Sequence, residues 1–185
     1  MKNIIRENSI VFLGLGNPGR DVRSPHNIGA HVCAKITDNL MQEEKTCMFI
    51  EKTINGEDIV FLWNIDYANL TGNKLVKFFS TQETLRNIPM VVFCDDIDIK
   101  PGKWVMSNGN NSHKGHNGIK NINIYKRNYL KVRIGTGRPA NEEDVYQFVL
   151  EKLNPKDWAL VEDAIDDIIL QLPKLILESK NLVKG

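Results

Sequence analysis

The chain has 185 residues, of which 42% are apolar, and its formal net charge is +1. These values are typical of one globular domain that is long enough to bury a substantial core. No run of 18 apolar residues occurs, so we expect no membrane-spanning helix. The start MKNIIRENS lacks the apolar stretch of a secretory signal. We predict a single domain over residues 1–185, with 1–8 as an extension and 179–185 as a frayed tail.

The cysteines indicate the redox environment. Cys33, Cys47 and Cys94 are odd in number and form no CxxC pair. This argues against a disulfide framework and against a structural zinc site, and it favours a reducing compartment. We therefore expect a cytoplasmic protein, with an organelle as the alternative.

The small net charge conceals an asymmetry along the chain. Residues 1–140 hold 19 Lys and Arg against 13 Asp and Glu, whereas residues 141–185 hold 5 against 10. No acidic residue occurs between Asp98 and Glu142. Such a window indicates either a surface that faces a polyanion or a solvated face balanced by the acidic C-terminal part. Its basic residues are Lys100, Lys103, Lys114, Lys120, Lys126, Arg127, Lys131, Arg133 and Arg138.

The first predicted elements are a strand, a turn and a helix. Ile10–Leu13 is a short apolar run that predicts a buried strand. The glycines and proline of residues 14–19 then predict a tight turn with little side-chain bulk. Apolar residues at helical spacing predict a helix over His26–Met41.

The middle of the chain contains a hairpin signal and a second helix. Cys47–Ile54 and Ile59–Trp63 resemble two strands, and the intervening Asn55–Asp58 favours a hairpin. Leu70–Phe79 predicts a helix whose Leu75, Phe78 and Phe79 face inward.

Three more strands and a long helix complete the pattern. Pro89–Cys94 predicts a central strand, and Lys103–Met106 and Tyr129–Ile134 predict two others. From Trp158 onward an amphipathic helix is expected, bent at Pro173. Strands that alternate with helices predict an α/β domain with a central, mixed but mostly parallel twisted sheet flanked by helices.

The glycine turn matches a nucleotide-binding pattern. Residues 14–19, GLGNPG, follow a strand and fit G-x-G-x-x-G. A dinucleotide site also needs a helix that begins within the glycines and an acidic residue about 20 positions later at the end of a second strand. Here Asp38 falls in the predicted first helix, and Pro18 and residues 20–25 extend the loop. A nucleotide-dependent oxidoreductase is therefore a weaker alternative.

A histidine and a carboxylate form the first candidate catalytic pair. His26 follows Pro25 at a helix start, where the helix dipole disfavours the imidazolium and keeps the ring able to accept a proton. Asp95 follows a buried strand, so its carboxylate projects from the same sheet edge. An imidazole oriented by a buried carboxylate can take a proton from water. A packing or capping role for His26, and Asp96 or Asp98 as its partner, are the alternatives.

Further polar candidates lie in two loops. His113 and His116 provide half of a metal site, with no third ligand evident, so we predict no metal. Asn69 precedes a predicted helix and is either its N-cap or a donor to a substrate oxygen, and Asn117 is a second such donor.

Six motifs in one order resemble peptidyl-tRNA hydrolase of the bacterial and organellar type, from about Ile10 to about Leu177. They are GLGNPG (14–19), HNIG (26–29), YANLTG (67–72), DDID (95–98), GHNGIK (115–120) and RIGTGRP (133–139). The resemblance implies a monomer that needs no cofactor or metal and cleaves the ester between a peptide and the 3′ ribose of tRNA. Its fold would be a mixed sheet surrounded by helices.

The resemblance also implies roles for individual residues. His26 would be the general base and Asp95 its orienting carboxylate. The residues implied to bind substrate are Asn17, Tyr67, Asn69 and Asn117; those implied to contact tRNA are Lys103, His116 and Arg133.

The chain departs from the family pattern at four places, one of which is the loop Gly109–Ser112 in place of the family's usual glycine-rich loop. Ala68 stands where the family usually has Met, and Cys94 where it usually has His. No Lys or Arg occurs over Val105–Ser107, where a second phosphate-binding base is expected. These departures concern substrate binding more than chemistry. A non-catalytic RNA-binding protein on the same scaffold is therefore the main alternative to a peptidyl-tRNA esterase.

Overall fold

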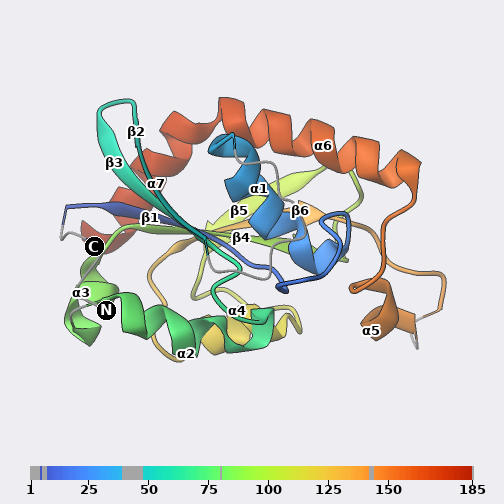
Figure 1. Cartoon of the computed structure of the whole chain (residues 1–185), viewed down its shortest axis with the longest axis horizontal. Coiled ribbons are helices and arrows are strands. Elements are labelled where there is room, and N and C mark those ends of the chain that lie inside the picture. Colours follow the sequence, from blue (N-terminus) through green and yellow to red (C-terminus); the bar gives the residue numbers. More distant parts are fainter. Residues whose placement is uncertain (1–4, 6–7, 39–47, 80, 142–143, 185) are drawn as a thin grey trace.

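A six-stranded sheet forms the centre of the molecule (Figure 1). The computed structural model describes residues 5, 8–38, 48–79, 81–141 and 144–184. The spatial order of the strands is β2-β3-β1-β4-β6-β5. Their bounds are β1 Ile10–Gly14, β2 Met48–Ile54, β3 Glu57–Trp63, β4 Met90–Asp96, β5 Trp104–Asn108 and β6 Leu130–Gly135.

The inner strands are parallel and the edges antiparallel. Parallel pairs join β3 to β1, β1 to β4 and β4 to β6, whereas β2 and β5 run antiparallel at the two edges. This arrangement confirms the predicted mixed, mostly parallel α/β sheet. Strands β1 and β4 are buried along their whole length, as expected for parallel strands covered on both faces.

Helices cover both faces of the sheet (Figure 1). On one side lie α1 (Ile28–Ile36), α6 (Pro155–Leu170) and α7 (Leu172–Lys184). On the other lie α2 (Thr71–Leu75), α3 (Gln82–Asn87) and α4 (Asn117–Ile122). Because neighbouring strand residues point to opposite faces, Phe12 packs with the first group and Leu13 with the second. Helix α5 is Val145–Phe148, and within the described residues 3-10 helices span Pro25–Asn27, Ala68–Leu70 and Val76–Phe78.

The predicted hairpin is confirmed, with a tighter turn. Strand β3 begins at Glu57, so only Asn55 and Gly56 connect it to β2. Both turn residues have positive φ, at 52° and 77°. A two-residue turn with positive φ at both positions matches the twist of the flanking strands. Cys47 lies outside the described residues.

Several helix boundaries differ from the prediction. Helix α1 ends at Ile36, not Met41, and Asp38 has a positive φ of 57°, which is incompatible with a continuing helix; residues 39–41 lie outside the described part. The predicted helix over Leu70–Phe79 is α2 followed by a 3-10 helix, with Leu75, Phe78 and Phe79 buried as expected. Helices α3, α4 and α5 carry too little periodic pattern to be seen in the sequence.

The C-terminal helix is interrupted rather than bent. Helix α6 ends at Leu170 and α7 begins at Leu172, so Pro173 lies in the first turn of a new helix. A proline is tolerated there because its missing N–H has no partner within the helix. The segment after Ser179, predicted to fray, is helical to Lys184, and Ser179 itself is buried. None of the described helices is long and apolar enough to cross a membrane.

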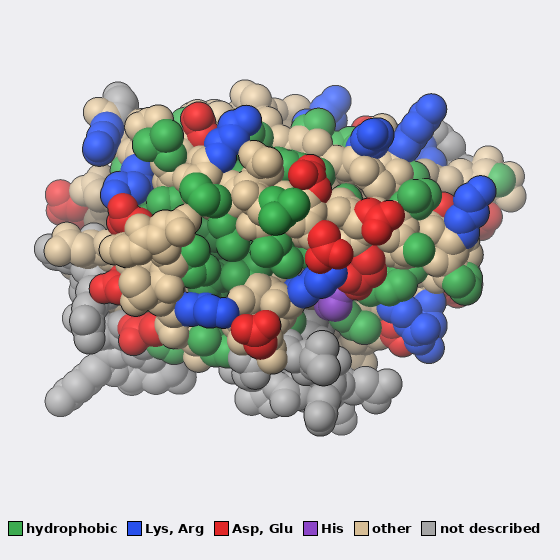
Figure 2. All heavy atoms as spheres, turned by 90° about the horizontal axis from the view of Figure 1, so that it is seen from above, with side chains coloured by type: hydrophobic (Ala, Val, Ile, Leu, Met, Phe, Trp, Pro, Cys, Tyr) green, Lys and Arg blue, Asp and Glu red, His purple; other side chains and the backbone are tan. Residues whose placement is uncertain are grey.

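The face over α6 carries mixed charge. Viewed from that side, acidic and basic side chains are interspersed around apolar ones, and no continuous basic area is visible (Figure 2). In part this reflects ion pairs between α1 and α6, where Glu162 contacts both His31 and Lys35. This face therefore has no extended basic surface to which a polyanion could bind.

Candidate active site

The loop after β1 is packed closely against α1. A Cβ on Gly14 would overlap the carbonyl oxygen of Gly29, so only glycine allows this approach. Helix α1 begins at Ile28, well past the glycine pattern. Packing between the loop and α1 thus explains Gly14, and the helix placement that a dinucleotide site requires is absent.

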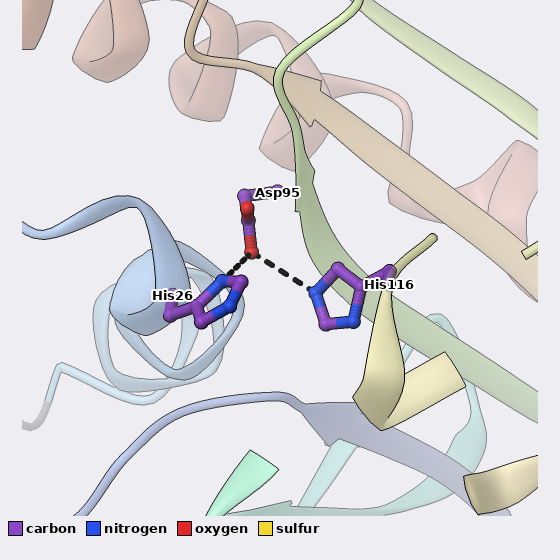
Figure 3. Close-up of side chains that lie close together, drawn as sticks. All are labelled: His26, Asp95 and His116. Atoms are coloured by element: carbon purple, nitrogen blue, oxygen red, sulfur yellow. Dashed lines mark hydrogen bonds and ion pairs between the residues drawn. The ribbon is translucent and has the colours of Figure 1, made fainter. Parts of the chain in front are cut away.

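His26 is held at the carboxyl edge of the sheet by the 3-10 helix Pro25–Asn27. Its backbone N–H donates to the carbonyl of Val149 at 3.0 Å, which ties this turn to the chain after α5. Its Nδ1 lies 2.9 Å from Oδ1 of Asp95, the penultimate residue of β4 (Figure 3). The contact predicted between His26 and Asp95 is confirmed.

His116 makes a second contact to the same carboxylate oxygen. Its Nε2 lies 3.1 Å from Oδ1 of Asp95, and its ring centroid lies 5.0 Å from that of His26 (Figure 3). His116 is also the N-cap of α4, where Nδ1 accepts from the N–H groups of Gly118 and Ile119. Because Nδ1 is an acceptor, the proton of a neutral ring resides on Nε2, which donates to Asp95.

The hydrogen bonds also define the tautomer of His26. Asp95 is an acceptor, so Nδ1 of His26 carries the proton and donates to it. Nε2 of His26 has no hydrogen-bond partner among the described residues, and the side chain is 24% exposed. A neutral His26 therefore presents the lone pair of Nε2 to whatever fills the space beside it.

The ionisation of the pair follows from burial and charge. Burial lowers the pKa of His26, but the charge of Asp95 and its hydrogen bond outweigh this effect, so that pKa is raised above its usual value. Burial raises the pKa of Asp95, but the two imidazoles outweigh it and hold that pKa below its usual range. The helix N-terminus alone predicts the opposite direction for His26, and the nearby carboxylate reverses it.

His26, Asp95 and His116 each offer a possible metal ligand, and the three ligand atoms lie within 4.8 Å of one another. A metal on Nε2 of His116 would move the ring proton to Nδ1, where it would face the N–H groups of Gly118 and Ile119. The cap of α4 therefore favours a hydrogen-bonded cluster over a metal centre.

Asn17 and Ala68 connect the first loop to the turn that bears Asn69. The side-chain oxygen of Asn17 accepts from the N–H of Ala68 at 2.9 Å. The N–H of Asn17 in turn donates to the side-chain oxygen of Asn27, next to His26. The amide NH₂ of Asn17 has no hydrogen-bond partner among the described residues.

Tyr67, Asn69 and Asn117 are exposed near this cluster. Asn69 lies in the 3-10 helix Ala68–Leu70, and Asn117 is the first residue of α4. The two elements contact each other, and Asn121 of α4 accepts from the N–H of Gly72 at 2.7 Å. Asn117 lines the cavity described below, whereas Tyr67 and Asn69 do not.

The basic window divides into buried, paired and exposed groups. Lys126 and Lys131 are 2% and 1% exposed, so they do not belong to a surface that faces a polyanion. Arg133 forms an ion pair with Asp96, while its Nε is buried without a partner. The exposed members without an ion pair among the described residues are Lys100, Lys103, Lys114, Lys120 and Arg127.

A cavity of about 430 Å³ opens beside the histidines. His26, Asp95, His116 and Asn117 line one part of it, and Arg133 another. Val145, Tyr146 and Val149 also line it, which sequence patterns do not predict, because α5 is too short to show periodicity. Cys94 also lines the cavity, and burial raises the pKa of its thiol, so the thiolate is disfavoured there.

Comparisons with known proteins agree with one another. The family model described as peptidyl-tRNA hydrolase matches residues 11–184. The peptidyl-tRNA hydrolase of Rickettsia bellii (strain OSU 85-389) is 35% identical over 181 residues, which cover 92% of this chain and 95% of the relative. That of Rickettsia canadensis is 34% identical over 178 residues, with the same coverage.

The fold agrees as well. The crystal structure of peptidyl-tRNA hydrolase from Acinetobacter baumannii superposes with a TM-score of 0.79 at 25% sequence identity, covering 97% of this chain and 95% of that one. Family and fold define a hydrolase that acts on ester bonds. The chain belongs to the peptidyl-tRNA hydrolase family.

Proposed function

We propose that this protein hydrolyses the ester between the peptide and the 3′ ribose of peptidyl-tRNA, with a water molecule activated by His26. The observation that carries the proposal is the hydrogen bond from Nδ1 of His26 to Asp95, which leaves Nε2 of His26 at the cavity as an acceptor. A positioned imidazole whose other nitrogen is held by a carboxylate is a general base.

In the proposed reaction the water lies against Nε2 of His26. Its oxygen attacks the ester carbonyl as its proton moves to Nε2, and Asp95 stabilises the imidazolium that forms. The amide groups of Asn17, Asn69 and Asn117 bind the substrate around the developing oxyanion. The same proton then passes to the departing 3′ oxygen of the ribose, so the peptide acid and tRNA are released and His26 is neutral again.

The tRNA is proposed to approach over the exposed part of the basic window. Lys103 lies directly before β5; Arg133, half-buried and paired with Asp96, lies on the neighbouring strand at the margin of this exposed part. Since phosphate contacts release counterions, binding should weaken as salt increases. His116, which the sequence assigns to tRNA contact, is instead proposed to hold Asp95, because both its ring nitrogens are used inside the protein.

A multiple-turnover assay with N-acetylated aminoacyl-tRNA tests the function. Hydrolysis with release of intact tRNA is expected. tRNA binding without turnover would instead support the non-catalytic alternative, which no feature of the site favours.

A further inference from the structure

Lysine and arginine side chains outnumber carboxylates in the lining of the cavity. Asp95 accepts from two imidazoles, and Asp96 is paired with Arg133 and also accepts from the N–H of Asp98 at 2.8 Å. Both carboxylates therefore have partners. Two cations of the cavity wall, Lys114 and Lys131, have no carboxylate partner among the described residues.

Lys131 is an ammonium group inside the protein. It is 1% exposed, and its Nζ donates to the carbonyls of Asn111 and Ser112 at 3.2 and 2.9 Å. An ammonium has three N–H donors, so one remains. Burial lowers the pKa of Lys131, and the charges of Arg133 and Lys114 act in the same direction, whereas Cys94 and the charge of Asp96 oppose the shift without cancelling it. A buried cation is costly without an opposite charge, and a ligand carboxylate would supply it.

Lys114 lines the same cavity from the loop before α4. Its φ of 51° belongs to the left-handed region, which a lysine rarely adopts. The Lys114 side chain is exposed, so a ligand can reach it. Its positive charge contributes to lowering the pKa of Lys131. Lys131 donates to Asn111 and Ser112 of the loop that also carries Lys114, so we call the part of the lining that these two lysines form its cationic end.

The remaining walls indicate the kind of ligand. The cavity lining also includes the apolar residues Ile97, Ile119, Val145 and Val149. RNA phosphates bind cations on open, solvated surfaces, whereas a partly apolar cavity of about 430 Å³ is of the size that holds small ligands. A short peptide end with one acidic side chain matches both the apolar walls and the cationic end.

We propose that this cavity holds the peptide part of the substrate and favours a peptide with Asp or Glu among its last residues, whose carboxylate lies between Lys114 and Lys131. The inference rests on the function proposed above. In the sheet, Lys131 is opposite Val92 and Ile134 is opposite Asp95. Lys131 and Ile134 are three residues apart on β6, so Lys131 and Asp95 are separated by about 10 Å along the strand direction. An extended peptide covers that length in about three residues, so the acidic residue is expected among the last three.

Two substrates that differ by one side chain test the proposal. They carry the same tRNA and the same N-acetylated tripeptide, with Glu or Gln at the penultimate position. The protein is expected to hydrolyse the Glu substrate with about fivefold higher kcat/KM, the scale of one partly exposed ion pair. Lys114→Gln should bring the ratio close to one, and Lys114→Arg should preserve it. Lys174→Gln, on exposed α7, is the matched control and should leave the ratio unchanged.

The outcomes separate this proposal from the function on which it rests. A ratio near one in the unmodified protein, with both substrates hydrolysed, would overturn the preference and leave the hydrolase function intact. An equal loss on both substrates in Lys114→Gln, with the ratio preserved, would assign Lys114 to RNA phosphate or to loop structure and would also overturn it. If neither substrate were hydrolysed, both proposals would fall. Thermal unfolding of each variant confirms that it is folded.

Discussion

His116 donates to Asp95 through a hydrogen bond of 3.1 Å whose direction is fixed by the start of α4. Because Nδ1 of His116 caps that helix, its Nε2 must carry the proton, and Asp95 must accept it. Asp95 is thereby held in place from one side by His116 while it orients His26 from the other. The site is consequently a three-residue cluster in which one carboxylate accepts hydrogen bonds from two imidazoles.

Removal of the proposed base should abolish most turnover. His26→Ala is expected to lower kcat by at least ~10²-fold, the usual contribution of a positioned base, while tRNA binding remains. Steady-state hydrolysis of peptidyl-tRNA measures the effect. His31→Ala, which alters a histidine paired with Glu162 away from the cavity, is the control and should keep kcat near that of the unmodified protein. A fully active His26→Ala variant would contradict the assignment.

The pH dependence should report the raised pKa of His26. A general base acts in its neutral form, so the rate rises with pH through the pKa of His26 in the folded protein. This midpoint is expected above the ordinary imidazole value of about 6.5. In Asp95→Asn the carboxylate charge is lost while burial remains, so the midpoint should move to lower pH and kcat should fall. A midpoint that moves upward would show that Asp95 is not the partner.

His116 offers a test that separates its two contacts. His116→Asn keeps a good N-cap for α4 but removes the Nε2–H donor to Asp95. Since the positive end of that donor disfavours the imidazolium of His26, its loss should raise the pH midpoint of the rate further. His116→Ala loses the cap as well and is expected to cost about 1 kcal/mol of unfolding free energy. Urea unfolding and the pH profile, measured on both variants, distinguish the contributions.

Asp96 should matter for stability and binding rather than for the proton transfer. Asp96→Asn leaves the Arg133 guanidinium without its carboxylate partner in a mostly buried place. Removal of one member of a buried ion pair is expected to destabilise the fold by up to about 3 kcal/mol, and KM should rise as Arg133 moves. The pH midpoint of kcat should stay where it is. If Asp96→Asn shifted that midpoint more than Asp95→Asn did, the roles of the two carboxylates would be reversed.

Much of the fold follows from local patterns. The buried runs around Phe12 and Val92 predict central strands because they have no polar face, and Asn55 and Gly56 predict a hairpin because they tolerate positive φ. Short helices such as α3 and α5 cannot be predicted from the sequence, because a segment of six residues or fewer is too short to show a helical repeat of apolar residues. Pro173 predicts a bend in the C-terminal helix, but the break before it cannot be located from the sequence, because the apolar spacing continues through Gln171.

The sequence by itself determined the catalytic candidates, because His26 and Asp95 each follow a signal that places them at the carboxyl edge of the sheet. Only the tertiary structure decided which of the remaining polar groups meet. In the folded chain Lys131 is buried, Arg133 is paired with Asp96, and His116 donates to Asp95. Such contacts join strands and loops far apart in the chain, and burial and hydrogen-bond direction depend on that long-range packing rather than on neighbouring residues.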